Sequence, residues 1–250
     1  MRTKLTNIKR FYTSALISLL ACSCSCLFGS SFTWVESDFT LQTDDWGGGA
    51  DSFLSTQDAI DPGNSYLRKE INITGGGGLK SRMVVRRPVN SNLIGSDPWL
   101  GNFNAKGIQS VDLDFINWSI DQPIYLRLAL SNVTNPMISS GTWWVSTTYA
   151  TFLPGNGWGG ASFNILETEM QRVGDFNGGF GQDSFQDTLL DIKGFRFIAS
   201  STGNSALGDE FSGAIGMDNV RLISSIPEPS RFTVGMGLLA TISLLRRRRR

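Results

Sequence analysis

Two neighbouring segments near the middle of the chain alternate between apolar and polar residues, and this pattern constrains the fold more than any other. From Val111 to Phe115 every second residue is apolar, with Asp112 and Asp114 between them. From 124 to 130, after a turn, the isoleucine and leucines again take every second position. A period of two residues places one side of a strand in a core and the other side toward solvent. We therefore predict two central strands of a β-sheet.

The alternation changes phase after Phe115. Ile116, Trp118 and Ile120 fall on the side opposite to Val111 and Phe115 if the strand is regular. An inserted residue that re-aims the side chains would explain the change, so we predict a β-bulge near Phe115. We then expect Trp118, and one of Trp143 or Trp144, to fill the core.

Further strands are predicted where β-branched and aromatic residues lie between Gly, Asn and Pro turns. They cover 32–39, 66–74, 79–89, 143–152, 194–199 and 215–222. A short helix is predicted over 165–173, because Asn164 can cap it, Glu167 follows three residues later and Gly174 can end it. The fold class is therefore all-β: a single jelly-roll-like β-sandwich of residues 32–225 with one short helix.

The negative charge of this body is offset in the total by basic residues at the two ends of the chain. The formal net charge of the 250 residues is zero, but from Phe32 to Ile226 twelve Lys and Arg face twenty-one Asp and Glu, a net charge of −9. Nucleic-acid binding needs clustered positive charge to replace counterions, so we expect no nucleic-acid partner.

The C-terminal residues 226–250 have the layout of a membrane tail. A motif at 226–230 contains Pro227, Glu228 and Pro229, and the two prolines keep the backbone extended. The apolar run 232–245 is predicted as a transmembrane helix of about 21 Å, shorter than the roughly 30 Å of a bilayer's hydrocarbon core. The run ends in a basic cluster that would stop it in the membrane, with the arginines on the cytoplasmic side. The cluster consists of Arg246, Arg247, Arg248, Arg249 and Arg250.

This order of motif, short helix and arginine cluster closely resembles the PEP-CTERM sorting signal of Gram-negative bacteria. The resemblance implies that an exosortase-type membrane protease recognises Pro227, Glu228 and Pro229 and removes the tail. The body would then be released to the cell surface or into extracellular polysaccharide. An ordinary C-terminal anchor with chance prolines is the alternative.

Residues 1–31 have the layout of a secretory signal peptide, with basic residues before an apolar stretch and small residues at its end. Signal peptidase and the general secretion machinery are then expected partners. Cleavage after Gly29 or Ser31 would remove all three cysteines and leave a mature protein without disulfides. The segment ending at Cys22 also resembles a bacterial lipoprotein box, so lipoprotein processing at Cys22 stays open.

The body shows a second resemblance, to laminin B-like and galactose-binding-like sandwich modules. It is carried by the order of 63–68, 111–115, 143–145 and 217–222. Such modules often hold a structural calcium between their first and last strands. The resemblance therefore implies Glu36, Asp38 and Asp218 as oxygen ligands; no other cofactor is expected.

Catalysis is restricted because the chain contains no histidine. Ser-His-Asp and Cys-His nucleophiles are excluded, and no catalytic residue is assigned. Glycoside hydrolysis needs only two carboxylates, and Asp112 with Asp114 or Glu167 with Glu169 are candidate pairs. On a strand and a helix, however, these pairs are expected to face solvent or to point apart.

Glycan binding is better supported by the composition, because sugars stack their C–H faces on aromatic rings. Trp46, Trp99 and Trp158 lie in predicted loops, where such modules bind, and are the candidate ligand-binding residues. We expect an exported, transiently anchored, non-enzymatic protein that is glycan-binding, adhesive or structural. A secreted glycan-degrading enzyme with paired carboxylates is the alternative.

Overall fold

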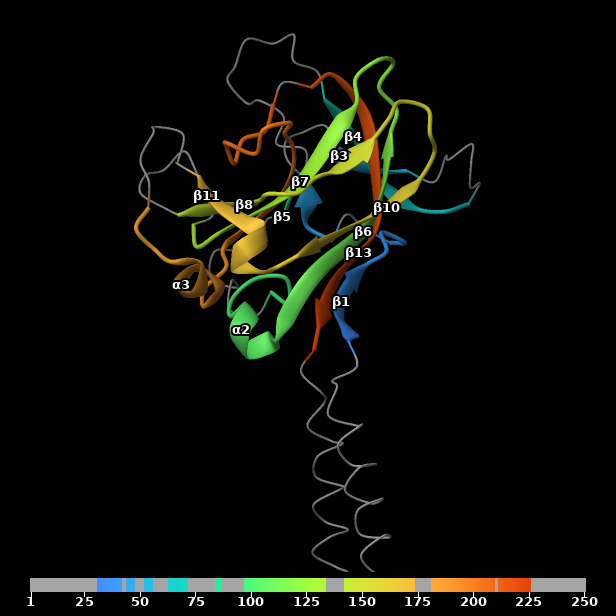
Figure 1. Ribbon diagram of the computed structural model, residues 1–250. Coiled ribbons are helices and arrows are strands. Elements are labelled where there is room, and N and C mark those ends of the chain that lie inside the picture. Colours follow the sequence, from blue (N-terminus) through green and yellow to red (C-terminus); the bar gives the residue numbers. More distant parts are fainter. Residues whose placement is uncertain are drawn as a thin grey trace, which may run out of the picture. The chain divides into compact units, whose positions relative to one another are not determined.

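The computed structural model describes residues 31–41, 44–47, 52–55, 63–71, 84–86, 97–133, 142–173, 181–209 and 211–225 (Figure 1). Phe32–Ser224 form one compact unit. The predicted signal peptide with Cys22, the predicted sorting motif, the apolar run 232–245 and the arginine cluster lie outside the described residues. No helix within the described ranges is long and apolar enough to cross a membrane.

The first layer of Phe32–Ser224 is a six-stranded antiparallel sheet (Figure 1). Its strand order is β10, β6, β13, β4, β3, and β1 also pairs with β13. The long strands β6 and β13 lie at its centre, which explains the alternation seen near Val111. The bounds are β1 Phe32–Ser37, β3 Ser52–Ser55, β4 Tyr66–Ile71, β6 Ile108–Asn117, β10 Gly159–Asn164 and β13 Gly213–Ser224.

The second layer is a seven-stranded antiparallel sheet with the order β11, β8, β7, β12, β5, β2, and with β9 paired to β7. Two short helices, α2 (Phe103–Lys106) and α3 (Phe185–Leu189), and one 3-10 turn, η3 (Glu167–Glu169), lie between strands. The strand bounds are β2 Trp46–Gly47, β5 Val84–Arg86, β7 Ile124–Ser131, β8 Trp143–Ser146, β9 Ala150–Phe152, β11 Met170–Val173 and β12 Gly194–Ala199. The predicted all-β sandwich is confirmed.

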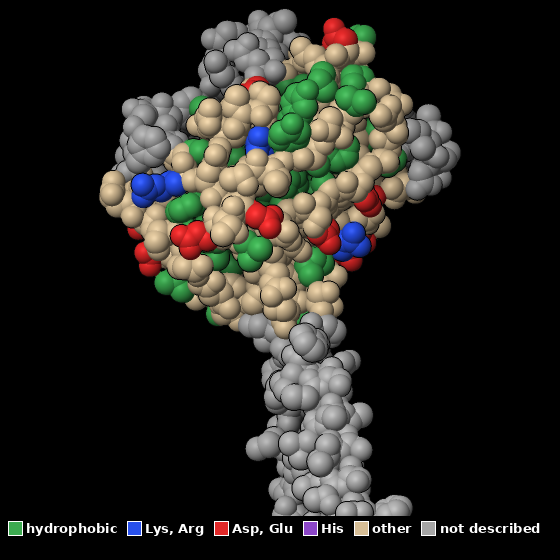
Figure 2. All heavy atoms as spheres, viewed as in Figure 1, with side chains coloured by type: hydrophobic (Ala, Val, Ile, Leu, Met, Phe, Trp, Pro, Cys, Tyr) green, Lys and Arg blue, Asp and Glu red, His purple; other side chains and the backbone are tan. Residues whose placement is uncertain are grey.

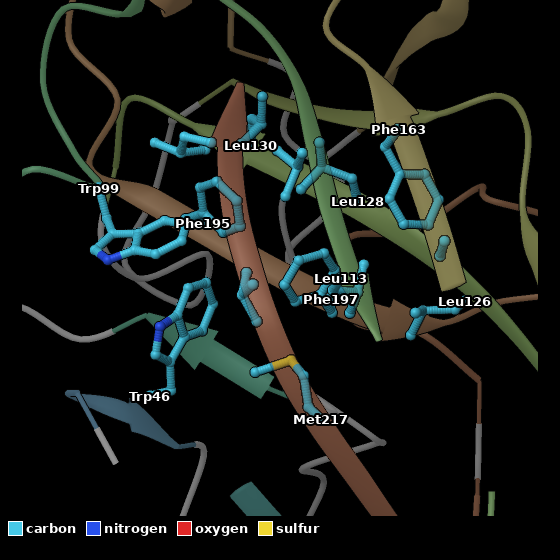
Figure 3. Close-up of a cluster of buried hydrophobic side chains, with 14 of the residues drawn as sticks. Trp46, Trp99, Leu113, Leu126, Leu128, Leu130, Phe163, Phe195, Phe197 and Met217 are labelled. Carbon is cyan, nitrogen blue, oxygen red and sulfur yellow. The ribbon is translucent and has the colours of Figure 1, made fainter. Parts of the chain in front are cut away.

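The core lies between the two sheets (Figure 3). Leu113 of β6 and Met217 of β13 meet Leu126, Leu128 and Leu130 of β7, with Phe195 and Phe197 of β12 beside them. These side chains are at most 1% exposed. The sequence alternation therefore assigned the buried side of β6 and β7 correctly.

A second apolar cluster covers the other face of the seven-stranded sheet. It includes Trp143, Val145 and Ile198, and Ala206 of the loop after β12 packs onto it. Arg127 is only 3% exposed and connects β7 to the segments that follow β8 and β12. Its guanidinium donates to the backbone carbonyls of Ser146, Thr147, Ser200 and Ser201. The apolar side chains at the centre of this face are thus buried by other residues of the same domain.

The helix predicted over 165–173 is wrong. β10 continues in register with β6 as far as Asn164, a single 3-10 turn follows at Glu167–Glu169, and Met170–Val173 pair with β8. The helix-start pattern at Asn164 is thus overridden by strand pairing on both sides, since tertiary contacts outweigh local propensity. Asn164 donates instead to the carboxylate of Glu169.

The bulge predicted near Phe115 is also misplaced. The pairing of β6 with β13 stays in register from Asn117 to Asp114, and its first shift lies between Asp218 and Arg221. The extra residue is therefore on β13, where Asn219 takes a left-handed φ of 48°. β6 stays regular from Ser110 to Asn117, so Ile116 and Trp118 point away from the core.

Candidate functional site

Three aromatic side chains gather on the outer face of the six-stranded sheet. Leu67 and Phe115 point into the core, so their neighbour Tyr66, and Trp118 just beyond β6, project to the opposite side. Tyr66 lies 5.4 Å from both Trp118 and Trp158, measured between ring centroids. The two tryptophans are 6.1 Å apart with an interplanar angle of 81°. Both are partly exposed, whereas Tyr66 is 0% exposed beneath them.

Gly216 makes room for Trp118 on the sheet. A Cβ built at Gly216 would lie 2.7 Å from Cη2 and 2.9 Å from Cζ3 of the Trp118 indole. It would also lie 2.7 Å from Cγ2 of Ile116, its partner on β6. The indole therefore rests against the backbone of β13, and only a residue without a Cβ fits below it.

Asn117 connects the loops that carry the two tryptophans. Its side-chain amide donates to the carbonyls of Gln122 and Phe152, at 2.8 and 2.9 Å, and its Oδ1 accepts from the backbone N–H of Ser119. The Asn117 carbonyl accepts from the N–H of Gly155 in the loop that leads to Trp158. Asn117 is 1% exposed, so these bonds are shielded from water. The Trp118–Trp158 pair is thus held in place before any ligand arrives.

A cation lies at one side of the pair. The guanidinium carbon of Arg68 is 5.3 Å from the centroid of the Trp118 ring, within the range of a cation–π contact. The same guanidinium forms an ion pair of 3.1 Å with Glu70, two residues along β4. The charge of Arg68 is therefore offset by a neighbour on its own strand.

Carboxylates lie on the other side of the pair. Asp112 and Asp114 project outward from β6, and their nearest strand neighbours on β10 are the small residues Ser162 and Gly160. The hydroxyl of Ser162 donates to Oδ1 of Asp112 at 2.7 Å, and the amide of Asn219 donates to Oδ2 of Asp114 at 2.9 Å. The six-stranded face thus combines stacking surface with hydrogen-bond acceptors.

A third aspartate is buried below this surface. Asp218 is 3% exposed, and it accepts from the amide of Asn64 and from the backbone N–H of Asn219, both at 2.8 Å. Burial raises the pKa of the Asp218 carboxyl; its two hydrogen bonds oppose this shift, and the charges of Asp114 and Asp38 add to it. Asp218 therefore anchors the start of β4 and the bulge of β13 at the edge of the site.

Similar proteins are found among solved structures but not by sequence. No family model matches the chain, and no curated protein matches its sequence. Among solved structures, the chain is similar to CtCBM11, known from a solution structure and binding studies, with a TM-score of 0.44 and 15% identity over 80% of this chain and 98% of that one. It is also similar to the CBM22-1 xylan-binding domain of Paenibacillus barcinonensis Xyn10C, with a TM-score of 0.46 and 7% identity over 80% of this chain and 97% of that one.

Of the three tryptophans predicted to bind ligand, only Trp158 belongs to this surface. Trp46 and Trp99 are each 2% exposed and pack edge to face in the core, with centroids 5.1 Å apart and both rings against Phe195 (Figure 3). The Nε1–H of Trp46 donates to the hydroxyl of Ser37. The prediction for Trp46 and Trp99 is therefore wrong, because neither ring offers a face to a ligand.

The predicted calcium ligands do not form a coordination shell. Asp38 is close enough to Asp218 to raise its pKa, but one oxygen of Asp38 accepts two hydrogen bonds from Thr40. Both oxygens of Asp218 are already used, and Glu36 is exposed on β1 opposite Arg221. In the described ranges no group of three or more His, Cys, Asp or Glu side chains is placed to hold a metal. In this part of the chain Glu36, Asp38 and Asp218 therefore do not come together as one three-carboxylate site.

The predictions for the carboxylate pairs have different outcomes. Asp112 and Asp114 face outward, as the alternation predicts. Glu167 is exposed and lies in a 3-10 turn instead of the predicted helix, and Glu169 binds Asn164. Only the first pair lies beside the tryptophans.

The residues that sequence reasoning missed are Trp118, Tyr66, Arg68 and Gly216. Trp118 was expected in the core, and the structure places it on the outer face. The signal was present in the change of phase at Ile116 and Trp118. We interpreted this change of phase as a bulge, whereas in the structure the strand is regular there and the apolar side chains lie on its outer face.

Proposed function

We propose that this protein is a non-enzymatic glycan-binding module, with the outer face of its six-stranded sheet as the binding surface. The observation that carries the proposal is the pair of partly exposed tryptophans, Trp118 and Trp158, held over the buried ring of Tyr66. Large aromatic side chains lower their free energy when they leave water, so fixing two of them at a surface favours a ligand that covers them.

The chemistry around the pair suits a sugar. A pyranose ring stacks an apolar C–H face on an indole while its hydroxyl groups remain at the rim. The carboxylates of Asp112 and Asp114 and the guanidinium of Arg68 lie at that rim and can accept from or donate to hydroxyls. The two indoles are nearly perpendicular, so they form a corner that suits a single glycan chain better than a flat crystalline surface.

Export and sorting belong to the same proposal. The segments 1–31 and 226–250 would direct the protein across the inner membrane, tether it briefly and offer Pro227–Glu228–Pro229 to an exosortase-type protease. The glycan-binding body would then remain at the cell surface or in the extracellular polysaccharide. The support is the sequence pattern of the two ends. Intact-mass analysis of protein recovered from the cell exterior tests it: both ends should be missing, and recovery of the full 250 residues with the arginines would contradict it.

The binding test uses the full-length protein in a detergent without a sugar headgroup, because an alkyl glycoside would compete for the site. Gels containing single neutral polysaccharides should retard the protein, and Trp118→Ala and Trp158→Ala should each abolish the retardation. Tyr149→Ala is the matched control, since Tyr149 is 48% exposed but packs on Tyr125 of the other sheet. Retardation that survives both tryptophan substitutions would refute this site.

The same samples distinguish the module from a glycan-degrading enzyme. The enzyme hypothesis is favoured by one observation: Asp112 and Asp114 lie side by side next to the tryptophans. Release of reducing sugar that disappears in Asp114→Asn would support the enzyme. Binding without any release supports the module.

A further inference from the structure

More acidic than basic side chains lie around the tryptophan pair, and this excess bears on whether the glycan is neutral or charged. On the outer face of the six-stranded sheet, β6 contributes Asp112 and Asp114, β13 contributes Asp218 and Arg221, and β4 contributes Arg68 and Glu70. Lys69, the remaining cation of β4, is 5% exposed and lies on the same side of the strand as the core residue Leu67. β10 contributes no charged side chain to this face.

Each guanidinium on this face has carboxylates near it. Arg68 is paired with Glu70 at 3.1 Å. Arg221 lies in register between Asp112 on β6 and Glu36 on β1, so carboxylates flank it on both sides. On the described face the carboxylates of Asp112, Asp114, Asp218 and Glu70 outnumber the guanidinium groups of Arg68 and Arg221. On the side shown in Figure 2, the described charged side chains are dispersed, without a large basic area.

The two outward carboxylates keep acceptor capacity for a ligand. One oxygen of Asp112 accepts from Ser162 and one oxygen of Asp114 accepts from Asn219. No described residue donates to the second oxygen of either group. The neighbouring edge strand carries Gly160, whose hypothetical Cβ would be 3.7 Å from Oδ1 of Asp114, so the approach to that oxygen is open.

We propose that this surface selects uncharged, hydroxyl-bearing glycan chains and rejects chains that carry carboxylate or sulfate groups. The proposal rests on the glycan-binding function above. Sugar hydroxyls donate to Asp112 and Asp114, which are acceptors only, and a hydrogen bond to a charged acceptor is stronger than one to a neutral acceptor. A uronate would bring a second negative charge to the same oxygens, where water is partly displaced and like charges repel.

The test compares two forms of one polymer. Full-length protein in the same detergent is titrated with whichever neutral polysaccharide retards it, and with the same polymer after oxidation of its C6 hydroxyls to carboxylates. The unmodified polymer should bind at least about tenfold more tightly in 0.15 M salt. Because the effect is a repulsion between charges, the ratio should shrink in 1 M salt, where the Debye length is about 3 Å.

Variants assign the selectivity to the two aspartates. In Asp112→Asn/Asp114→Asn the ratio should fall toward one, mainly because the oxidised polymer gains affinity. Asp191→Asn is the control, since it makes the same charge change at an exposed site outside the six-stranded sheet. Equal binding of both polymer forms by the wild type, or an unchanged ratio in the double variant, overturns the charge selectivity and leaves the glycan-binding function standing. Failure to bind any neutral polysaccharide refutes the binding function itself.

Discussion

Trp118 lies directly on Gly216: a Cβ at position 216 would come within 2.7 Å of Cη2 of the indole. The contact joins the end of β6 to the middle of β13, so the position of the stacking ring depends on the absence of a side chain on a neighbouring strand. The position of the Trp118 ring is thus set by the sheet. Adding a single methyl group at position 216 should displace the ring.

Gly216→Ala tests this dependence. The added methyl group cannot be accommodated without moving Trp118 or Ile116, so we expect a loss of about 1–3 kcal/mol in the free energy of unfolding. Glycan affinity should fall as well, because the ring is displaced. Urea unfolding and gel retardation measure the two effects. Gly160→Ala, where the nearest atom is at an ordinary 3.7 Å, is the control and should leave stability nearly unchanged.

Removal of either partly exposed indole should weaken binding more than it weakens the fold. Trp118→Ala and Trp158→Ala are each expected to cost about 2 kcal/mol or more of binding free energy, as for aromatic anchors at interfaces. Titration calorimetry with a neutral oligosaccharide measures the loss. If Tyr149→Ala weakens binding as much as Trp158→Ala, the surface has been assigned to the wrong sheet.

The buried tryptophans should behave in the opposite way. Trp46→Phe removes the hydrogen bond to Ser37 and leaves a small cavity between Trp99 and Phe195. We expect the unfolding free energy to drop by about 1–3 kcal/mol, while the glycan affinity of the folded protein stays within about twofold of the wild type. A variant with normal stability and lost binding would restore Trp46 as a ligand-binding residue.

Asn117 should affect stability and binding together. Asn117→Ala removes three hydrogen bonds at a position 1% exposed, for which we expect a loss of about 2–4 kcal/mol in stability. The loops bearing Trp118 and Trp158 would then be less constrained, so affinity should fall too. Asn132→Ala is the control, because Asn132 makes two hydrogen bonds, to Thr142 and Asp183, in loops beside the other sheet. Equal loss of affinity in both variants would argue against a positioning role of Asn117.

Asp218 predicts a dependence of stability on pH. Burial raises the pKa of its carboxyl in the native state, so the native protein binds more protons than the unfolded chain above the unfolded pKa of about 3.9. The free energy of unfolding contributed by this group therefore falls as the pH rises from the unfolded toward the native pKa. The fall amounts to about 1.4 kcal/mol for every pH unit that separates the native pKa from the unfolded pKa. Above the native pKa the unfolding free energy is lowered by the full cost of burying the ionised carboxylate.

The variant Asp218→Asn cannot titrate at this position. Its loss of one hydrogen bond is the same at every pH, so its stability relative to the wild type should improve as the pH rises from the unfolded pKa of about 3.9 toward the native pKa. Urea unfolding midpoints across this range measure the difference. A difference that is constant with pH would show that Asp218 has an ordinary pKa.

The strands of the sandwich could be predicted because their periodicity reflects burial on one side. The alternation at Val111–Phe115 and at 124–130 indicated the core faces of β6 and β7 directly. The region after Asn164 could not be predicted, because its helix-start pattern is local while the pairing of Met170–Val173 with β8 is a contact between distant segments.

The site was harder to predict than the fold for a related reason. Loop position suggested exposure for Trp46 and Trp99, but both rings turn inward to fill the space beside Phe195. Trp118 was expected inside because large apolar residues usually are. Whether a tryptophan at the end of a strand points in or out depends on the register with the neighbouring strands. Here the regular register of β6 turns Trp118 outward, and Gly216 on β13 leaves room for its ring.

The first and last strands of the domain pair with each other, and Phe32 lies opposite Ser224. The chain thus enters and leaves the sandwich at neighbouring points. Tension applied through both ends at once would open β1 from β13 like a zipper, one hydrogen-bonded pair after another, instead of loading all of these bonds together. The domain should therefore resist force better when the force acts between one end of the chain and another part of the domain than when it acts between the two ends.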